Sequence, residues 1–238
     1  MLAAGYIACF MLSLGDAKAV QATKGPGGMF EKVHAYLAER EKEFGSIPRE
    51  RRALLKSIAD FVVEQQRASQ PVKLLFVCMH NSRRSQLGQI WSAAAAAYYG
   101  LTLPWTYSGG TESSAFNSRA VAAMERAGLK TEKTTADENP IYHVRFGEGG
   151  PVITAFSKTI GNAPNPKKDF CAIMVCANAD RSCPVVPGAV ARVAVPYEDP
   201  KESDGTPSEA KTYDERCRQI AREMLYVMSV VRSTGESR

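Results

Sequence analysis

The sequence predicts an α/β domain in which a parallel four-stranded sheet is flanked by helices, with an N-terminal helical extension. Two observations lead to this expectation. From Pro71 onward, short apolar segments alternate with longer helical ones, which is the pattern of a parallel sheet with crossover helices. Before Pro71 only helical periodicities are found. We therefore assign residues 29–70 to the extension and residues 71–238 to the α/β domain.

The first strand is expected at Lys73–Val77, because this segment is short, apolar and bounded, as buried parallel strands are. The remaining elements follow in order. Further strands are expected at Trp105–Ser108, Ala172–Val175 and Arg192–Val195, and helices at Gln86–Tyr99, Ser118–Ala127 and Glu209–Val230. An inserted hairpin is expected where Ile141–Phe146 and Val152–Phe156 flank a glycine-rich turn.

Two amphipathic helices are predicted in the extension. Apolar residues recur at helical spacing between Phe30 and Leu37 and again between Leu54 and Val62. Gly45–Pro48 separates the two segments, with a serine suited to a helix cap and a proline suited to a helix start. We expect this helical hairpin to pack on the main domain.

Residues 1–28 have two interpretations. Leu2–Gly15 is uncharged and too short to cross a bilayer, and small-residue cleavage sites follow it, as in a secretory signal peptide. The segment lacks the basic residues that normally precede such a stretch. Translation that begins at Met29 would make these residues a start-site artefact, and a linker precedes Met29 under either interpretation.

The composition of the chain favours some classes of partner and argues against others. The chain has 30 Lys+Arg against 25 Asp+Glu, a net charge of +5 that is compatible with an anionic substrate. No basic run with interleaved aromatic residues is present, so we expect no nucleic-acid partner. Apart from a cleaved signal peptide, we expect no membrane association, because residues 54–238 contain no apolar stretch of sufficient length.

The loop between the first predicted strand and the next helix carries the chemistry. Five residues separate Cys78 from Arg84, and a loop of this length can turn its backbone N–H groups inward to cradle a tetrahedral oxyanion. Arg84 can bind two oxygens of the anion, and the helix N-terminus together with this guanidinium favours the thiolate of Cys78. A thiolate below a bound phosphate or arsenate is placed for in-line attack.

The other loop residues have expected places as well. Ser85 can hydrogen-bond the sulfur, and Asn81 can brace the loop from inside. His80 and Arg83 are expected to face solvent or the cleft rim. The expected oxyanion-binding set is Met79, His80, Asn81, Ser82, Arg83, Arg84 and Ser85.

These motifs resemble the low-molecular-weight protein tyrosine phosphatases and the thioredoxin-coupled arsenate reductases built on the same fold. The resemblance covers about Pro71 to Val230, through the segments Phe76–Ser85, Ser108–Glu112, Asn117–Ala120 and Tyr197–Pro200. It implies that the Asp-Pro pair after the last strand supplies the general acid, Asp199. Physical reasoning agrees, because a carboxyl group on a loop at the C-terminal edge of the sheet can reach the leaving oxygen.

Two further cysteines favour the reductase. Cys176 ends an apolar strand, and Cys183 follows after six residues in a polar loop. Because parallel strands end at one edge of the sheet, Cys176 is expected near Cys78. The resemblance implies that Cys176 and Cys183 are the second and third redox cysteines. Cys78 would attack arsenate while Asp199 protonates the departing hydroxide. Cys176 would then displace arsenite from Cys78, and Cys183 would relay the disulfide to a thioredoxin-like reductant.

Two alternatives remain open. The first is a phosphatase that acts through a Cys78–phosphate intermediate, with Cys176 and Cys183 protecting Cys78 by a reversible disulfide. The second is a non-catalytic oxyanion-binding or redox-sensing module, which would not need Asp199.

No tightly bound cofactor or metal is expected. His80 and His143 each stand apart from other metal ligands, which does not fit a zinc site. Gln89 stands where the reductases carry a glutamate that helps to bind a potassium ion, and this departure argues against a potassium site. The expected partners are arsenate or a phosphate ester and a thioredoxin-like protein. A relay of thiols favours the cytoplasm, whereas a genuine signal peptide would place the protein outside it.

Overall fold

The computed structural model describes residues 28–101, 104–183 and 185–236. The predicted leader, residues 1–28, lies outside the described residues except for Gly28. Across the described ranges, no helix combines the length and hydropathy that a bilayer crossing requires.

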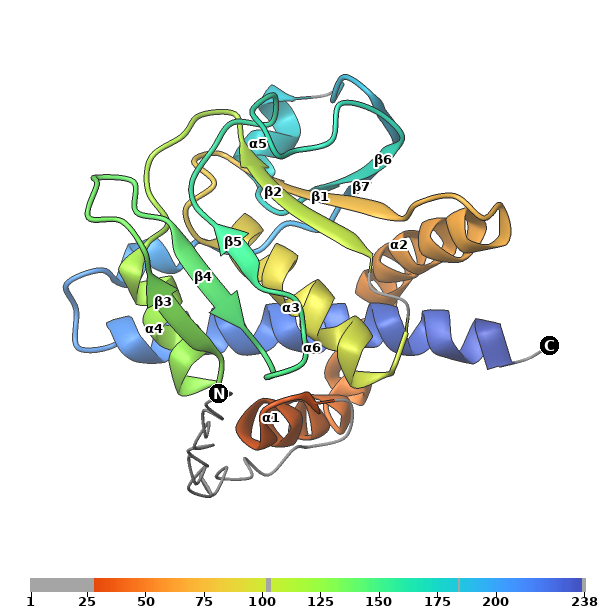
Figure 1. The fold of residues 1–238 in the computed structure, drawn as a ribbon, viewed down its shortest axis with the longest axis horizontal. Coiled ribbons are helices and arrows are strands. Elements are labelled where there is room, and N and C mark those ends of the chain that lie inside the picture. Colours follow the sequence, from red (N-terminus) through yellow and green to blue (C-terminus); the bar gives the residue numbers. More distant parts are fainter. Residues whose placement is uncertain (1–27, 102–103, 184, 237–238) are drawn as a thin grey trace, which may run out of the picture.

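The main sheet has four parallel strands in the order β2-β1-β6-β7, which confirms the predicted fold class (Figure 1). Every residue of β1 after Lys73 and every residue of β6 is buried, as expected for central strands covered on both faces. Both β6 and β7 begin before the residues predicted for them. The strands are β1 (Lys73–Cys78), β2 (Trp105–Gly110), β6 (Phe170–Met174) and β7 (Ala189–Ala194).

Helices from both parts of the chain cover this sheet. In the α/β domain, α3 (Arg84–Tyr98) lies against β1 and β2, while α2 (Arg49–Arg67) of the extension lies against β6 and β7. The long α6 (Glu209–Glu236) packs on both helices and also on α4 (Ser118–Arg126), and it spans much of the width of the molecule in Figure 1. Because α2 packs on β6 and β7, two of the four strands, the extension is part of the main core.

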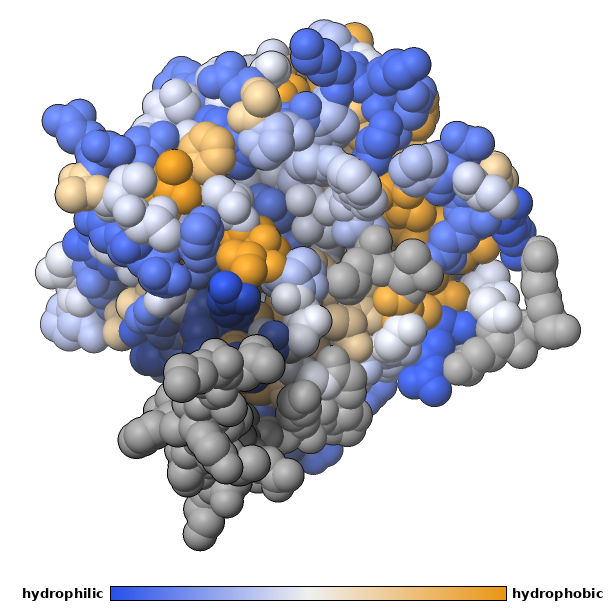
Figure 2. Space-filling view, in the orientation of Figure 1, coloured by the Kyte–Doolittle hydropathy of each residue, from blue (hydrophilic) through white to orange (hydrophobic). Residues whose placement is uncertain are grey.

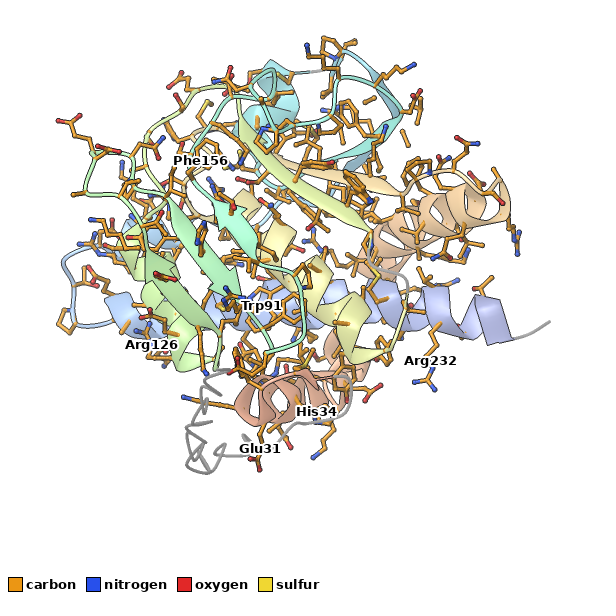
Figure 3. The ribbon with its side chains drawn as sticks, viewed as in Figure 1. Glu31, His34, Trp91, Arg126, Phe156 and Arg232 are labelled. Atoms are coloured by element: carbon orange, nitrogen blue, oxygen red, sulfur yellow. The ribbon has the colours of Figure 1, made fainter. Side chains whose placement is uncertain are left out.

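The extension is completed by α1 (Glu31–Glu41) and the short 3-10 helix η2 (Phe44–Ser46). The fully buried Trp91 of α3, labelled in Figure 3, links these layers. Tyr36 of α1 stacks on Trp91 with ring centroids 5.3 Å apart, and the Trp91 indole N–H donates to Cys217 Sγ of α6 at 3.2 Å. The side chains of three helices therefore meet in one core.

A second, antiparallel sheet contains the predicted hairpin as β4 (Tyr142–Arg145) and β5 (Ile153–Ala155). The sequence analysis missed its third strand, β3 (Lys130–Lys133), which pairs with β4. Lys-Thr-Glu-Lys has no apolar alternation, so its own residues do not predict a strand, and its pairing with β4 was not visible in the sequence. A bridge between Met29 and Gly147 joins this sheet to the extension.

The segment after β6 differs from the loop that the sequence predicted. The polar loop expected between Cys176 and Cys183 is a helix, α5 (Ala177–Ser182). Its six residues are too few to show a helical period in the sequence. A 3-10 helix, η3 (Pro200–Ser203), follows the expected acid Asp199, whose side chain accepts from the amide of Lys201.

The molecular face in Figure 2 is mainly polar, and its apolar groups are small and separated. Large apolar side chains are exposed at a few positions, and scattered exposure of this kind is normal for a folded domain. These residues are Leu54, Trp105, Val152, Val185 and Val190.

Gly88 tests how tightly α3 packs on the sheet. A Cβ atom at this position would lie 2.5 Å from Cδ1 of the buried Phe76. We expect Gly88→Ala to lower the free energy of unfolding by about 1–3 kcal/mol through overpacking, although alanine normally favours a helix. Gly235→Ala is the matched control, because no heavy atom lies within 4 Å of its Cβ position. Equal or greater stability of Gly88→Ala in urea unfolding would contradict this packing.

Candidate active site

The loop from Cys78 to Arg84 is held in shape by Asn81. Asn81 has a positive φ of 48°, a conformation that asparagine adopts more readily than most residues. Its Nδ2 donates to Ser85 Oγ at 2.8 Å, and its Oδ1 accepts from the backbone N–H of Lys158 at 3.0 Å. The brace expected from the sequence is present, and it also ties the loop to the segment after β5.

Neighbouring segments support the loop from outside. The carbonyl of His80 accepts from Ser157 Oγ at 2.8 Å, and Ser82 Oγ donates to the Ala115 carbonyl at 2.6 Å. Gly110, at the end of β2, fits closely, because a Cβ there would lie 2.6 Å from Met79 O and 2.8 Å from Asn81 N. Contacts within the protein therefore hold the loop in shape, which reduces the cost of ordering it on binding.

Cys78 lies at the floor of this loop and is 3% exposed. Its Sγ is 3.1 Å from Ser85 Oγ. Because Asn81 already donates to Ser85 Oγ, the serine hydroxyl hydrogen is available to the sulfur. Ser85 can thus donate to a Cys78 thiolate, as the sequence analysis expected.

The acid expected at Asp199 is in direct contact with the loop. Arg84 Nη2 donates to Asp199 Oδ2 at 2.6 Å. Arg83 forms two further hydrogen bonds, from Nε to Oδ1 at 2.8 Å and from Nη2 to Oδ2 at 3.2 Å. Arg83 is only 9% exposed, so the prediction that it faces solvent or the rim is wrong. His80 does remain exposed, with its Nε2 3.5 Å from Glu112.

These contacts fix the charge of Asp199. Burial alone would raise the pKa of this carboxyl, but hydrogen bonds from Arg83 and the charges of Arg84 and Arg83 outweigh it and hold the pKa below its usual value. Asp199 is therefore a carboxylate at neutral pH. Arg84 also donates from Nη1 to the Tyr197 carbonyl at 3.0 Å, while its buried Nε has no partner among the described residues. A substrate oxygen would satisfy this donor.

The second and third cysteines lie at the same end of the sheet. The amide of Val175 donates to the Val77 carbonyl at 2.8 Å, where strands β1 and β6 end. Cys78 is the residue after Val77 and Cys176 is the residue after Val175, so both cysteines lie at this edge of the sheet. Cys176 is 1% exposed and caps α5, its Sγ accepting from the Ala179 amide at 3.3 Å. Cys183 is partly buried at the opposite end of α5.

The intact helix keeps these two thiols apart. Seven residue steps along a helix span about 10 Å, whereas a disulfide needs Cα atoms within about 7 Å. A bond between Cys176 and Cys183 therefore requires α5 to unwind. Burial raises the pKa of Cys171 and of Cys217 to about 12, so these two remain thiols and do not compete as nucleophiles.

Lys158 is a residue that the sequence analysis missed. Its side chain is 3% exposed, with Nζ 3.3 Å from the Phe156 carbonyl, 3.4 Å from Ser108 Oγ and 4.6 Å from the centre of the Phe156 ring. Burial lowers the pKa of Lys158 to about 8. The buried ammonium places positive charge beside the loop that Asn81 braces.

Nearby, Gln89 contributes no negative charge for a cation, and its Nε2 donates to the Thr106 carbonyl at 3.1 Å. Among the described residues, no group of three or more histidine, cysteine or acidic side chains could hold a metal ion.

Comparisons with known proteins support an enzyme of the arsenate reductase or low-molecular-weight phosphatase type. The chain is 27% identical over 164 residues to an arsenate reductase of Oceanobacillus iheyensis, covering 68% of this chain and 96% of the relative. It is 29% identical over 146 residues to an arsenate reductase of Bacillus subtilis, covering 61% and 86%. The resemblance drawn from the motifs is thereby confirmed. No protein-family model matches the chain.

Solved structures of arsenate reductases also align with this chain, with TM-scores below 0.5. An arsenate reductase from Archaeoglobus fulgidus aligns with a TM-score of 0.41 and 18% identity, covering 66% of this chain and 98% of that one. A thioredoxin-dependent arsenate reductase from Corynebacterium glutamicum aligns with a TM-score of 0.34 and 19% identity, covering 81% and 82%.

Lys158 gives a pH-dependent prediction. Its folded pKa of about 8 lies below the usual lysine value, so folding carries a penalty that is full below pH 8 and disappears as pH rises toward about 10.5. We expect Lys158→Met to raise the free energy of unfolding at pH 7 by up to about 3 kcal/mol, with a smaller gain at pH 9.5. Urea unfolding at both pH values measures this. A gain that grows with pH would contradict the assignment of a buried ammonium.

Proposed function

We propose that this chain reduces arsenate to arsenite, with Cys78 as nucleophile and Cys176 and Cys183 as a disulfide relay. The main support is the placement of the three thiols. Cys176 lies beside the strand end that carries Cys78, and Cys183 lies at the far, more accessible end of α5. The curated relatives in the comparison are arsenate reductases, which supports the same substrate.

Binding of arsenate begins with an exchange of anions. Arsenate oxygens would take the loop N–H groups and the free Nε of Arg84, and they would compete with the Asp199 carboxylate for Arg84 Nη2. As Asp199 loses contact with the arginines, the interactions that depress its pKa weaken, and it can take up a proton. Substrate binding would thus favour the protonated form of Asp199, which is the form that can act as an acid.

Two displacement steps then follow in sequence. The Cys78 thiolate attacks arsenic, and the departing hydroxide takes the proton of Asp199 and leaves as water. The Cys176 thiolate next attacks the sulfur of Cys78, and the electron pair of the S–As bond remains on arsenic, which leaves as arsenite. Arsenic gains two electrons, and Cys78 and Cys176 are oxidised to a disulfide.

The relay continues through α5. Cys183 attacks Cys176 as the helix unwinds, which releases the Cys78 thiolate and forms the Cys176–Cys183 disulfide. A thioredoxin-like dithiol is the proposed reductant. The exposed Val185 and Val190, close in sequence to Cys183, offer apolar contact for such a partner. A reducing compartment such as the cytoplasm fits this chemistry.

A phosphatase is the second candidate. Cys78, Arg84 and Asp199 suffice for attack on a phosphate ester, and Ser85 is placed to stabilise the sulfur when it leaves the phosphoryl group. Water would hydrolyse the intermediate, and Cys176 would not be required.

Single-turnover arsenate reduction by fully reduced protein separates the two candidates. We expect one arsenite for each pair of thiols lost in the unaltered chain and none in Cys176→Ser, because the attack on Cys78 is then missing. Cys183→Ser is expected to complete one turnover and then stop. Cys171→Ser is the matched control, because this buried thiol has no step in the relay. Constant thiol content, with aryl phosphate hydrolysis that survives Cys176→Ser, would identify a phosphatase.

Asp199→Asn tests the anion exchange. The neutral amide no longer competes for Arg84, so we expect tighter binding of phosphate as an unreactive anion, measured by calorimetry. The same change removes the acid, and turnover should fall by about 100-fold or more. Weaker phosphate binding, or an unchanged turnover, would exclude the proposed part of Asp199.

A further inference from the structure

Arg51, on α2 of the extension, reaches the segment that leads from β7 to Asp199. Its Nη2 donates to the Val195 carbonyl at 3.2 Å. Its guanidinium also lies over the ring of Tyr197, 4.6 Å from the ring centre. A residue outside the α/β domain therefore contacts the chain two and four positions before the candidate acid.

Arg51 is itself fixed by Glu223 of α6. Its Nε donates to Glu223 Oε2 at 2.9 Å, and its Nη2 lies 2.8 Å from the same oxygen. The two side chains are 15% and 1% exposed, so solvent hardly screens the pair. Charge-assisted contacts of this kind hold a guanidinium in one orientation. Arg51 is thus a rigid support.

The oxyanion loop holds the same segment at a second point. The Tyr197 carbonyl accepts from Arg84 Nη1 at 3.0 Å, and the Tyr197 amide donates to the Val175 carbonyl at 3.1 Å. Tyr197 is 4% exposed. Arg51 and Arg84 therefore meet at one residue, the first through its ring and the second through its backbone.

We infer that Arg51 is a positioning residue that sets the place of Asp199 through Tyr197, so that the extension forms part of the active site. The inference rests on the proposed function, because it concerns the acid of that reaction. An acid must lie within hydrogen-bond reach of the leaving oxygen, and a misplacement of about 1 Å can cost about 100-fold in rate. Loss of the contact between Arg51 and the Tyr197 ring would allow such a shift of Asp199, two residues further along the chain.

Arg51→Lys is the variant that tests this inference. Lysine keeps a positive charge opposite Glu223, but it lacks the planar fork that stacks on Tyr197 while reaching Val195. We expect the single-turnover rate of arsenite formation to fall by about tenfold or more with phosphate affinity little changed. Arg218→Lys is the matched control, because Arg218 joins α6 to Glu43 of the extension and should leave the rate unchanged.

A double-mutant cycle shows whether Arg51 acts through the acid. In an Asp199→Asn background, Arg51→Lys should cause little further loss of rate. A loss as large as in the unaltered chain would overturn the inference. If Arg51→Lys is unstable, the double variant Arg51→Gln/Glu223→Gln replaces the buried ion pair by two amides, and the same cycle applies.

Amide hydrogen exchange measures how firmly the Tyr197 segment is held, independently of enzyme activity. We expect the Tyr197 amide to exchange faster in Arg51→Lys than in Arg218→Lys, because its segment has lost a support. Equal exchange in the two variants would overturn the inference. A chain that neither reduces arsenate nor hydrolyses aryl phosphates, yet shows this difference in exchange, would refute the proposed function and retain Arg51 as the support of the segment.

Discussion

The contact of Asp199 with Arg83 and Arg84 is the interaction on which the geometry of the candidate site depends. It joins the N-terminus of α3 to the segment after β7, so two loops from distant parts of the sequence are held together. Two guanidinium groups beside an oxyanion loop repel each other and require an anion. The carboxylate of Asp199 is such an anion, and it accepts hydrogen bonds from both side chains.

In the proposed function, the pairing explains how an aspartate that is anionic before the substrate binds could still act as an acid. Its pKa is held down by the same arginines that a substrate anion would bind. Under this proposal, protonation of Asp199 and substrate binding are linked through Arg84.

Much of this arrangement could be predicted because its signals are local. An apolar strand, a loop of fixed length and a helix lie consecutively around Cys78, and the braces from Asn81 and Ser85 are short-range. The place of Arg83 could not be predicted, since its partner is 116 residues away. The sequence did not reveal β3, because this strand lacks an apolar alternation and is defined by its pairing with β4. It did not reveal α5, because this helix is shorter than the window that shows a helical period. The extension was expected to pack on the domain, but its contact with the segment before Asp199 depends on tertiary structure alone.

The short helix α5 has a consequence for the order of events among the thiols. While it is folded, Cys176 is buried at one end and Cys183 lies at the other, too far apart to bond. An oxidant in solution could therefore join Cys176 to Cys183 only after the helix unwinds. In the proposed relay, folded α5 would delay the Cys176–Cys183 disulfide until Cys176 has reacted with Cys78.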